Sequence, residues 1–325
     1  DQPWYASNRD LSKPPFCRAE LYRSLPDLKN RFTGEVRDAD LVMVGSYVPE
    51  GVAVGDWVLL NARGVTAFYD IDTPITLTRL DRGDTEYISR TLVMRYDLYL
   101  SFTGGPTLER LEERYHAPRA RVLYCSVDPE KYYPEDCEGE WDLGYLGTYS
   151  EDRQPALQQL MLRPASRWGE GRFIVAGPMY PNGNGWPCNV KRLEHLGPAH
   201  HRAFYNSQRF TLNITRADMV RAGYSPSVRL FEAAACGTPI ISDCWSGLND
   251  VFDTGSEILV SRSPEDTLAF LREIPERERV LIGSRARARV LKEHTADHRA
   301  AQLEQYAAEL SGEQVLPAAA RNAGM

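Results

Sequence analysis

The segment SPSVRLFEAAACGTPIIS, from Ser225 to Ser242, combines residues that bind anions with residues that end a helix. A helix N-terminus presents unpaired N–H groups and a partial positive charge, and Ser225 and Ser227, which flank a proline, are typical of such a start. Arg229 falls in the first turn and Glu232 follows on the same helical face. The guanidinium of Arg229 could bind a phosphate, and the carboxylate of Glu232 could bind both hydroxyls of a ribose. The alternative is ordinary capping beside a surface ion pair.

A second group of candidates follows the apolar run Val65–Tyr69, in the sequence FYDIDTP. If this run is a strand of a parallel sheet, Asp70 and Asp72 lie at its carboxyl edge, where such sheets bind ligands. Asp72 is then a candidate general base, or a ligand of the molecule that is deprotonated. The alternative is that Asp72 or Thr73 caps a helix that begins at the following proline.

The elements that must position these residues alternate between apolar runs and helical patterns, which indicates parallel sheets wrapped by helices. With 325 residues, the chain is expected to form two domains of roughly 150 residues each. The acidic stretch Tyr132–Trp141 lacks apolar periodicity and is typical of a linker, and Pro275–Tyr306 is typical of a charged amphipathic helix. The predicted strands are Leu41–Gly45, Val65–Tyr69, Leu98–Phe102, Val122–Ser126, Leu143–Leu146, Phe173–Ala176, Phe210–Ile214 and Pro239–Ser242.

Composition excludes several classes of function. The net charge of −7, without a Lys/Arg-rich run, argues against a nucleic-acid partner. No run approaches the about 20 apolar residues of a transmembrane segment. The six cysteines are scattered without metal-ligand spacing, so we expect no metal site, no disulfide framework and a cytoplasmic location. No GxGxxG sequence follows a predicted strand, which disfavours a dinucleotide-dependent oxidoreductase.

Four segments in order resemble a known family. The sequence EAAACGTPII from Glu232 resembles the EAMACGTPVV signature of the donor-binding domain of GT-B glycosyltransferases. The other three are CSVDPEKYYP from Cys125, LGYLGTYSEDR from Leu143 and FIVAGP from Phe173. Within the GT-B class the sequence is most similar to the bacterial CgeB-like group, whose PSxRxFEAAACG pattern is matched from Pro226.

This resemblance implies an α/β, GT-B fold, with two Rossmann-like doubly wound domains that face a cleft. The implied domains are an acceptor-side domain over 1–133, a nucleotide-sugar-binding domain over 134–298, a helix over 299–311 that returns to the first domain, and a mobile tail over 312–325. Residues 1–15 are polar and contain prolines, whereas a doubly wound domain usually begins with an apolar strand. We therefore expect the first strand–helix unit to be absent from the first domain.

The resemblance also implies an enzyme that moves a sugar from a nucleotide-diphosphate sugar, of UDP type, to an unknown glycan, protein or small-molecule acceptor. No cofactor and no metal ion are expected. Glu232 is expected to bind the ribose, and Arg229, Ser225 and Ser227 the diphosphate. The remaining donor-binding candidates are Arg153 after the turn at Gly147 and Thr148, and Arg216 after a predicted strand.

The sequence departs from the family at one position of consequence. Retaining GT-B enzymes carry a further glutamate eight positions before the one matched by Glu232, and Tyr224 stands there instead. Either Tyr224 or Asp218 then contacts the sugar, or the stereochemical course differs. His195 could lie near the base, although a packed or exposed histidine is the simpler interpretation, and His200 and His201 are expected to form an exposed pair.

Two further interpretations remain open at this point. Asp70-Ile-Asp72 is a DxD sequence, with which GT-A glycosyltransferases hold a divalent metal ion against the donor. That interpretation leaves the segment Ser225–Ser242 unexplained. The other is a GT-B-shaped protein that binds a sugar nucleotide or a partner without transferring a sugar, which Tyr224 in place of a glutamate would fit.

Overall fold

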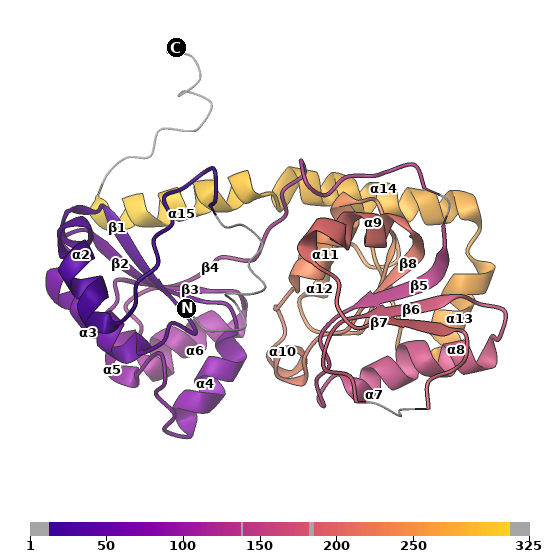
Figure 1. The fold of residues 1–325 in the computed structure, drawn as a ribbon, viewed down its shortest axis with the longest axis horizontal. Coiled ribbons are helices and arrows are strands. Elements are labelled where there is room, and N and C mark those ends of the chain that lie inside the picture. Colours follow the sequence, from indigo (N-terminus) through magenta and orange to yellow (C-terminus); the bar gives the residue numbers. More distant parts are fainter. Residues whose placement is uncertain (1–12, 138, 182–184, 313–325) are drawn as a thin grey trace, which may run out of the picture. The chain divides into compact units, whose positions relative to one another are not determined.

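The computed structural model describes residues 13–137, 139–181 and 185–312. Their contacts divide the chain into two compact units (Figure 1). The first comprises Asp1–Leu123 together with Ala301–Met325, and the second comprises Tyr124–Ala300.

The first unit is built on a parallel four-stranded sheet of order β1-β2-β3-β4. Its strands are β1 (Leu41–Gly45), β2 (Val65–Asp70), β3 (Leu98–Ser101) and β4 (Ala120–Val122). Its helices are α2 (Leu25–Asp38), α3 (Gly51–Asn61), α4 (Thr73–Asp81), α5 (Arg90–Val93) and α6 (Pro106–Tyr115).

Both faces of this sheet are covered. Side chains alternate along β2, so that Phe68 packs among α3 to α6 while Ala67 points to the opposite face. On that opposite face, Leu303 and Tyr306 of α15 (Ala296–Ser311) pack against the sheet. The Tyr306 hydroxyl also donates a hydrogen bond to the Val122 carbonyl oxygen, 3.1 Å away. The last helix therefore supplies one layer of the first unit (Figure 1).

The second unit is built on a parallel six-stranded sheet of order β10-β9-β8-β5-β6-β7. Its strands are β5 (Trp141–Leu146), β6 (Phe173–Ala176), β7 (Val190–Leu193), β8 (Gln208–Asn213), β9 (Ile240–Ser242) and β10 (Leu259–Val260). Its helical segments are α7 (Gln154–Leu157), η1 (Gln158–Leu162), α8 (Arg163–Arg167), η2 (Pro198–His200), α9 (His201–Asn206), α10 (Ala217–Ala222), α11 (Val228–Ala235), α12 (Leu248–Val251), α13 (Pro264–Glu273) and α14 (Glu276–Glu293).

The strand order gives this second sheet a topological switch point. The chain runs from β5 outward to β7, then returns to the other side of β5 with β8 and continues outward to β10. Connections from β5 and β8 therefore leave in opposite directions from the carboxyl ends of these two strands. This edge is where an open α/β sheet binds its ligand.

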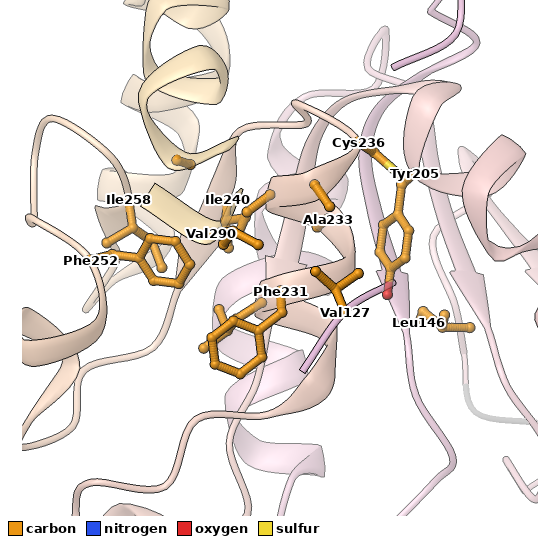
Figure 2. Packing of buried hydrophobic residues seen from close by; sticks show 14 of the residues in the cluster. Val127, Leu146, Tyr205, Phe231, Ala233, Cys236, Ile240, Phe252, Ile258 and Val290 are labelled. Carbon is orange, nitrogen blue, oxygen red and sulfur yellow. The ribbon is translucent and has the colours of Figure 1, made fainter. Parts of the chain in front are cut away.

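Helix α11 lies in the core beside β8 and β9, and small residues make this close packing feasible (Figure 2). Its residues Ala233 and Phe231 are completely buried. A Cβ at Gly283 of α14 would lie 2.1 Å from the Gly237 carbonyl oxygen, so only glycine permits the approach of α14 to the end of α11. The sequence EAAACG thus fixes a helix tightly against the sheet.

Several predicted elements are confirmed, among them the strands over 41–45 and 173–176 and the helix that begins at Val228. The strand predicted over Val122–Ser126 is wrong, because β4 ends where the prediction begins. Strands β7 and β10 were not predicted. The single helix predicted over Pro275–Tyr306 is two helices, since Thr295 forms a bridge with Val127 and hydrogen-bonds His298 at the start of α15.

Candidate functional site

The carboxyl ends of β5 and β6 approach each other through two glycines. The Gly147 N–H donates to the Ala176 carbonyl oxygen at 2.8 Å. A Cβ at Gly177 would lie 2.1 Å from the Gly147 carbonyl oxygen, and Gly177 has a φ of +149°. Thr148, next in the chain, is exposed. The turn predicted at Gly147 and Thr148 therefore lies at the carboxyl edge of the sheet, with Thr148 exposed to solvent.

Three of the predicted arginines gather at this edge. Arg153 donates from Nη2 to the Thr148 carbonyl oxygen at 2.9 Å, and Arg229 donates from Nη2 to the Ile214 carbonyl oxygen at 3.3 Å, directly after β8. Arg216 lies two residues after Ile214 in the chain. Burial, together with the positive charges of Arg229 and Arg216, lowers the pKa of Arg153. Cations packed this closely favour an anion among them.

Two buried polar atoms at this edge lack a hydrogen-bond partner among the residues that the structure describes. They are Nε of Arg229 and the hydroxyl of Tyr145, both buried. The guanidinium carbon of Arg229 lies 6.0 Å from the centre of the Tyr145 ring. Buried polar groups are nearly always paired in folded proteins. A phosphate would supply the acceptor that Arg229 Nε needs.

Two aspartates that the sequence analysis did not single out hold the loop after β8. Asp243 accepts hydrogen bonds from the Thr215 backbone N–H and hydroxyl, both at 2.9 Å. Asp152 accepts from the Ala217 N–H at 3.0 Å and lies 3.8 Å from Arg216 Nε. Their sequence neighbourhoods carry no signal for this role, because each contact joins positions far apart in the chain. Together they position Arg216 at the carboxyl edge.

Glu232 lies on the buried side of α11 with 12% of its side chain exposed. Its two carboxylate oxygens each accept a tyrosine hydroxyl, Tyr132 at Oε1 and Tyr205 at Oε2, both at 2.9 Å. Burial and the charge of Glu232 raise the pKa of Tyr205 well above its usual range, which keeps this hydroxyl a donor. The surface ion pair between Arg229 and Glu232, which was the alternative interpretation of this segment, is not found among the described residues. Each side chain is held instead by other groups.

The histidines are placed differently from the expectation. His195 and His200 are exposed, but His201 at the start of α9 is partly buried, with Nδ1 3.9 Å from Oε2 of Glu232. The prediction of an exposed pair is therefore wrong for His201. A helical wheel of α9 could have found it, because Tyr205 lies four residues later on the same face.

The two serines before α11 use their hydroxyls within the protein. Ser225 donates to the Gly223 carbonyl oxygen at 2.9 Å, and Ser227 donates to Asn213 Oδ1 at 2.7 Å. Neither hydroxyl caps α11, although Ser227 occupies the N-cap position. The hydrogen bond to Asn213 ties the start of α11 to the end of β8. These serines therefore position the helix N-terminus at the carboxyl edge.

Tyr224 adopts an uncommon left-handed conformation, with a φ of +49°. Its N–H donates to the Ser246 carbonyl oxygen at 2.6 Å. A Cβ at Gly247 would lie 2.3 Å from the Tyr224 ring, so a glycine there makes room for the ring. Such backbone strain in a non-glycine residue is common at functional sites. Asp218, the other candidate for the sugar contact, pairs with Arg221.

In the first unit, the two carboxylates of the DxD sequence have different environments. Asp70 is completely buried and accepts hydrogen bonds from the Tyr99 hydroxyl at 2.6 Å and the Thr76 hydroxyl at 3.0 Å. Burial raises its pKa to about 6 against these hydrogen bonds. Asp72 is only partly buried and accepts from the Tyr47 hydroxyl at 2.7 Å. Asp72 occupies the N-cap of α4 without a side-chain capping bond.

Three further features of the structure concern metal binding, the cysteines and membrane-spanning helices. Among residues 13–137, 139–181 and 185–312, no group of three or more His, Cys, Asp or Glu side chains is arranged to hold a metal ion. All six cysteines are free. No helix in these ranges is long and apolar enough to cross a membrane.

The chain has a GT-B fold, like that of several solved glycosyltransferases. Sucrose-phosphate synthase from Thermosynechococcus elongatus superposes with a TM-score of 0.61 at 15% identity, over 93% of this chain and 82% of that one. HepE of Anabaena, in complex with UDP and glucose, gives 0.66 at 13% identity over 87% and 81%. Trehalose 6-phosphate synthase from Burkholderia multivorans gives 0.61 at 12% identity over 88% and 75%.

The sequence of the second unit also matches a family model. Residues 153–305 match the model of a family described as glycosyl transferase-like. No curated protein sequence matches the chain. The family match and the fold together support an enzyme that transfers a sugar from a nucleotide sugar.

These findings decide between the two glycosyltransferase interpretations. Because the chain has a GT-B fold, the GT-A interpretation of the DxD sequence is wrong. The physical reason is visible at Asp70, whose oxygens already accept hydrogen bonds from Tyr99, Thr76 and the Asp72 N–H inside the first unit. The DxD sequence is thus a structural carboxylate followed by a more accessible one.

Proposed function

We propose that this protein transfers a sugar from a UDP-type nucleotide sugar, bound by the second unit at the carboxyl ends of β5 and β8, without a metal ion or other cofactor. The observation that carries the proposal is the gathering of Arg153, Arg216 and Arg229 at one edge of the sheet. Glu232 lies one turn after Arg229 on the same helix, so the two side chains can address neighbouring parts of one ligand.

Each residue has a role that its chemistry suits. The three arginines and the N-terminus of α11, through the backbone N–H groups of Ser225 and Ser227, bind the diphosphate and stabilise the charge that develops on it as the sugar leaves. The backbone at Gly147 and Thr148 lets the diphosphate approach closely. Glu232 accepts hydrogen bonds from the ribose. Arginines replace the metal ion that other glycosyltransferases use to neutralise this diphosphate.

We further propose that the first unit binds the acceptor and that Asp72 deprotonates it. Asp72 follows β2, at the carboxyl edge of the first sheet, and is more accessible than Asp70. Tyr224, in its strained conformation, contacts the donor sugar in place of a glutamate. The pattern PSVRLFEAAACG favours the bacterial CgeB-like group within the GT-B class. Six free cysteines fit a reducing cytoplasm.

The test is thermal unfolding in the presence of UDP, GDP, ADP and dTDP, each with and without EDTA. A ligand at 100 times its Kd should stabilise the folded protein by about 2.7 kcal/mol. We expect stabilisation by UDP that EDTA does not change and that Glu232→Ala removes. Stabilisation by none of the four would refute the proposal. Loss of stabilisation with EDTA would refute metal independence.

A protein that binds the nucleotide sugar without transferring the sugar is the competing function, and Tyr224 in place of the expected glutamate favours it. Donor hydrolysis separates the two. Slow release of UDP from UDP-glucose or UDP-N-acetylglucosamine, lost in Arg229→Ala, is expected of a transferase without its acceptor. Binding without any UDP release, in the presence of a broad acceptor panel, would favour the binding protein.

A further inference from the structure

Of the two ring nitrogens of His201, one is hydrogen-bonded within the described residues and the other is not. Nε2 lies 3.2 Å from the Leu196 carbonyl oxygen. Since a carbonyl oxygen only accepts, Nε2 must carry the hydrogen, and in the neutral ring Nδ1 is then a bare acceptor. Nδ1 is buried and has no hydrogen-bond partner among the described residues. It lies 3.9 Å from Oε2 of Glu232, too far for a direct hydrogen bond.

The carboxylate opposite this nitrogen is fixed in place. Tyr132 and Tyr205 donate to its two oxygens at 2.9 Å, one from before β5 and the other from the same helix as His201. Each carboxylate oxygen keeps a second acceptor position. While the ring of His201 is neutral, neither Nδ1 nor the Glu232 carboxylate can donate a hydrogen bond to the other. A molecule with two neighbouring O–H groups can donate to both of these facing acceptors.

We infer that His201 is a second ribose-binding residue: Nδ1 accepts a hydrogen bond from one hydroxyl of the donor's vicinal diol while Glu232 accepts from the other. This inference rests on the proposed function, since it assumes that Glu232 binds the ribose. The site is selective by hydrogen-bond polarity. A phosphate or carboxylate, which has only acceptors at neutral pH, is disfavoured there, whereas a ribose diol presents two donors.

The inference distinguishes ribose from deoxyribose nucleotides. A 2′-deoxy or 3′-deoxy nucleotide lacks one of the two donors, so either Nδ1 or a carboxylate oxygen stays unpaired in the complex. Leaving a buried acceptor without a partner weakens binding more than the loss of contact alone. His201 would thereby contribute to selection of ribonucleotide donors, a property that Glu232 alone would impose less strictly.

The test is a cycle of protein variants against ligand hydroxyls, with affinities measured by calorimetry. The ligands are UDP, 2′-deoxy-UDP and 3′-deoxy-UDP, and the variants are His201→Phe and His201→Asn. We expect His201→Phe to weaken UDP binding about fivefold to tenfold. For one deoxynucleotide the same variant should cost nothing further, because the hydroxyl that Nδ1 receives is already gone. His201→Asn, whose side-chain oxygen can replace Nδ1, should restore most of the affinity.

The outcomes separate this inference from the proposed function. UDP binding by the wild type and its loss in Glu232→Gln, with His201→Phe weakening all three ligands equally, would overturn the inference and leave the proposed function intact. No binding of UDP to the wild type would overturn both. His200→Phe, a change at an exposed neighbour, is the matched control and should leave all three affinities unchanged. Unfolding curves of each variant identify a loss that reflects folding.

Discussion

The Tyr132 hydroxyl donates to Glu232 Oε1 at 2.9 Å, which joins positions 100 residues apart in the chain. Tyr132 begins the stretch that the sequence predicts as a linker, whereas Glu232 lies on a buried helix of the sheet. A segment without regular structure thus reaches the proposed ribose site and fixes its carboxylate.

Tyr132→Phe should therefore weaken UDP binding about threefold to tenfold, because the carboxylate loses one of the two donors that orient it. Folding stability should change by about 1 kcal/mol or less. Calorimetric titration and thermal unfolding measure the two effects. Tyr133→Phe is the control, since this exposed neighbour stacks on Arg202 through its ring, 4.2 Å away, and phenylalanine keeps the ring. Equal losses in both variants would contradict the role of Tyr132.

The arginine cluster predicts a dependence on the phosphates of the ligand. Arg229→Ala removes charge-assisted hydrogen bonds, so UDP affinity should fall about tenfold to a hundredfold. Uridine has no phosphate, and its weaker affinity should stay the same. Arg272→Ala, at an exposed position of α13, should alter neither affinity. If Arg229→Ala weakened uridine and UDP by the same factor, Arg229 would act on the fold and not on the diphosphate.

A catalytic role for Asp72 requires that its loss affect the reaction and not donor binding. Asp72→Asn should lower the transfer rate about a hundredfold or more, which is the usual contribution of a general base. UDP affinity should be unchanged, because the proposed donor site lies in the other unit. Asp84→Asn, an exposed aspartate after α4, should keep the full rate. Full activity of Asp72→Asn would show that this residue only begins the helix.

Asp70 predicts a pH dependence of stability in the first unit. Its pKa of about 6 in the folded protein exceeds the ordinary value of an aspartate, because burial penalises the charged form. Folding therefore favours the protonated acid, and the stability that Asp70 contributes is present at low pH and is lost as pH rises through about 6. Asp70→Asn should consequently cost more stability at about pH 4.5 than at about pH 7.5.

Chemical denaturation at the two pH values measures this difference. Tyr99→Phe removes a hydrogen bond that lowers the pKa of Asp70 in the folded protein, so the loss of stability should then extend to higher pH. A deficit of Asp70→Asn that is the same at both pH values would contradict the raised pKa.

The sequence predicts the central strands of both sheets because their apolar runs are unbroken. Phe173–Ala176 is completely buried and its predicted bounds are those observed. Edge strand β7 was missed, since Lys191 and Arg192 interrupt its apolar pattern where only one neighbouring strand covers it. The run Val122–Ser126 is equally apolar, yet the pairing with β3 ends at Val122. The end of a strand depends on the neighbouring strand with which it pairs, and the local sequence does not show where that pairing stops.

The same distinction applies to the proposed site. The local sequence predicts a helix that begins just before Arg229 and contains Glu232 one turn later. Both residues lie on α11 in that order. The contributions of Tyr132, His201 and Asp243 arise from contacts between distant positions, which no spacing rule reveals. The interpretation of Asp70 failed for a related reason, since a three-residue pattern does not tell a buried carboxylate from an accessible one.

Helix α15 makes the first unit depend on a segment that follows the second unit in the chain. Its final turns cover the face of the first sheet that carries Ala67 and Leu100, yet the ribosome makes them only after the whole second unit. Until they emerge, the N-terminal unit exposes that apolar face to other nascent chains. A premature stop before Leu303 would therefore leave the first unit incomplete, although its four strands were made long before.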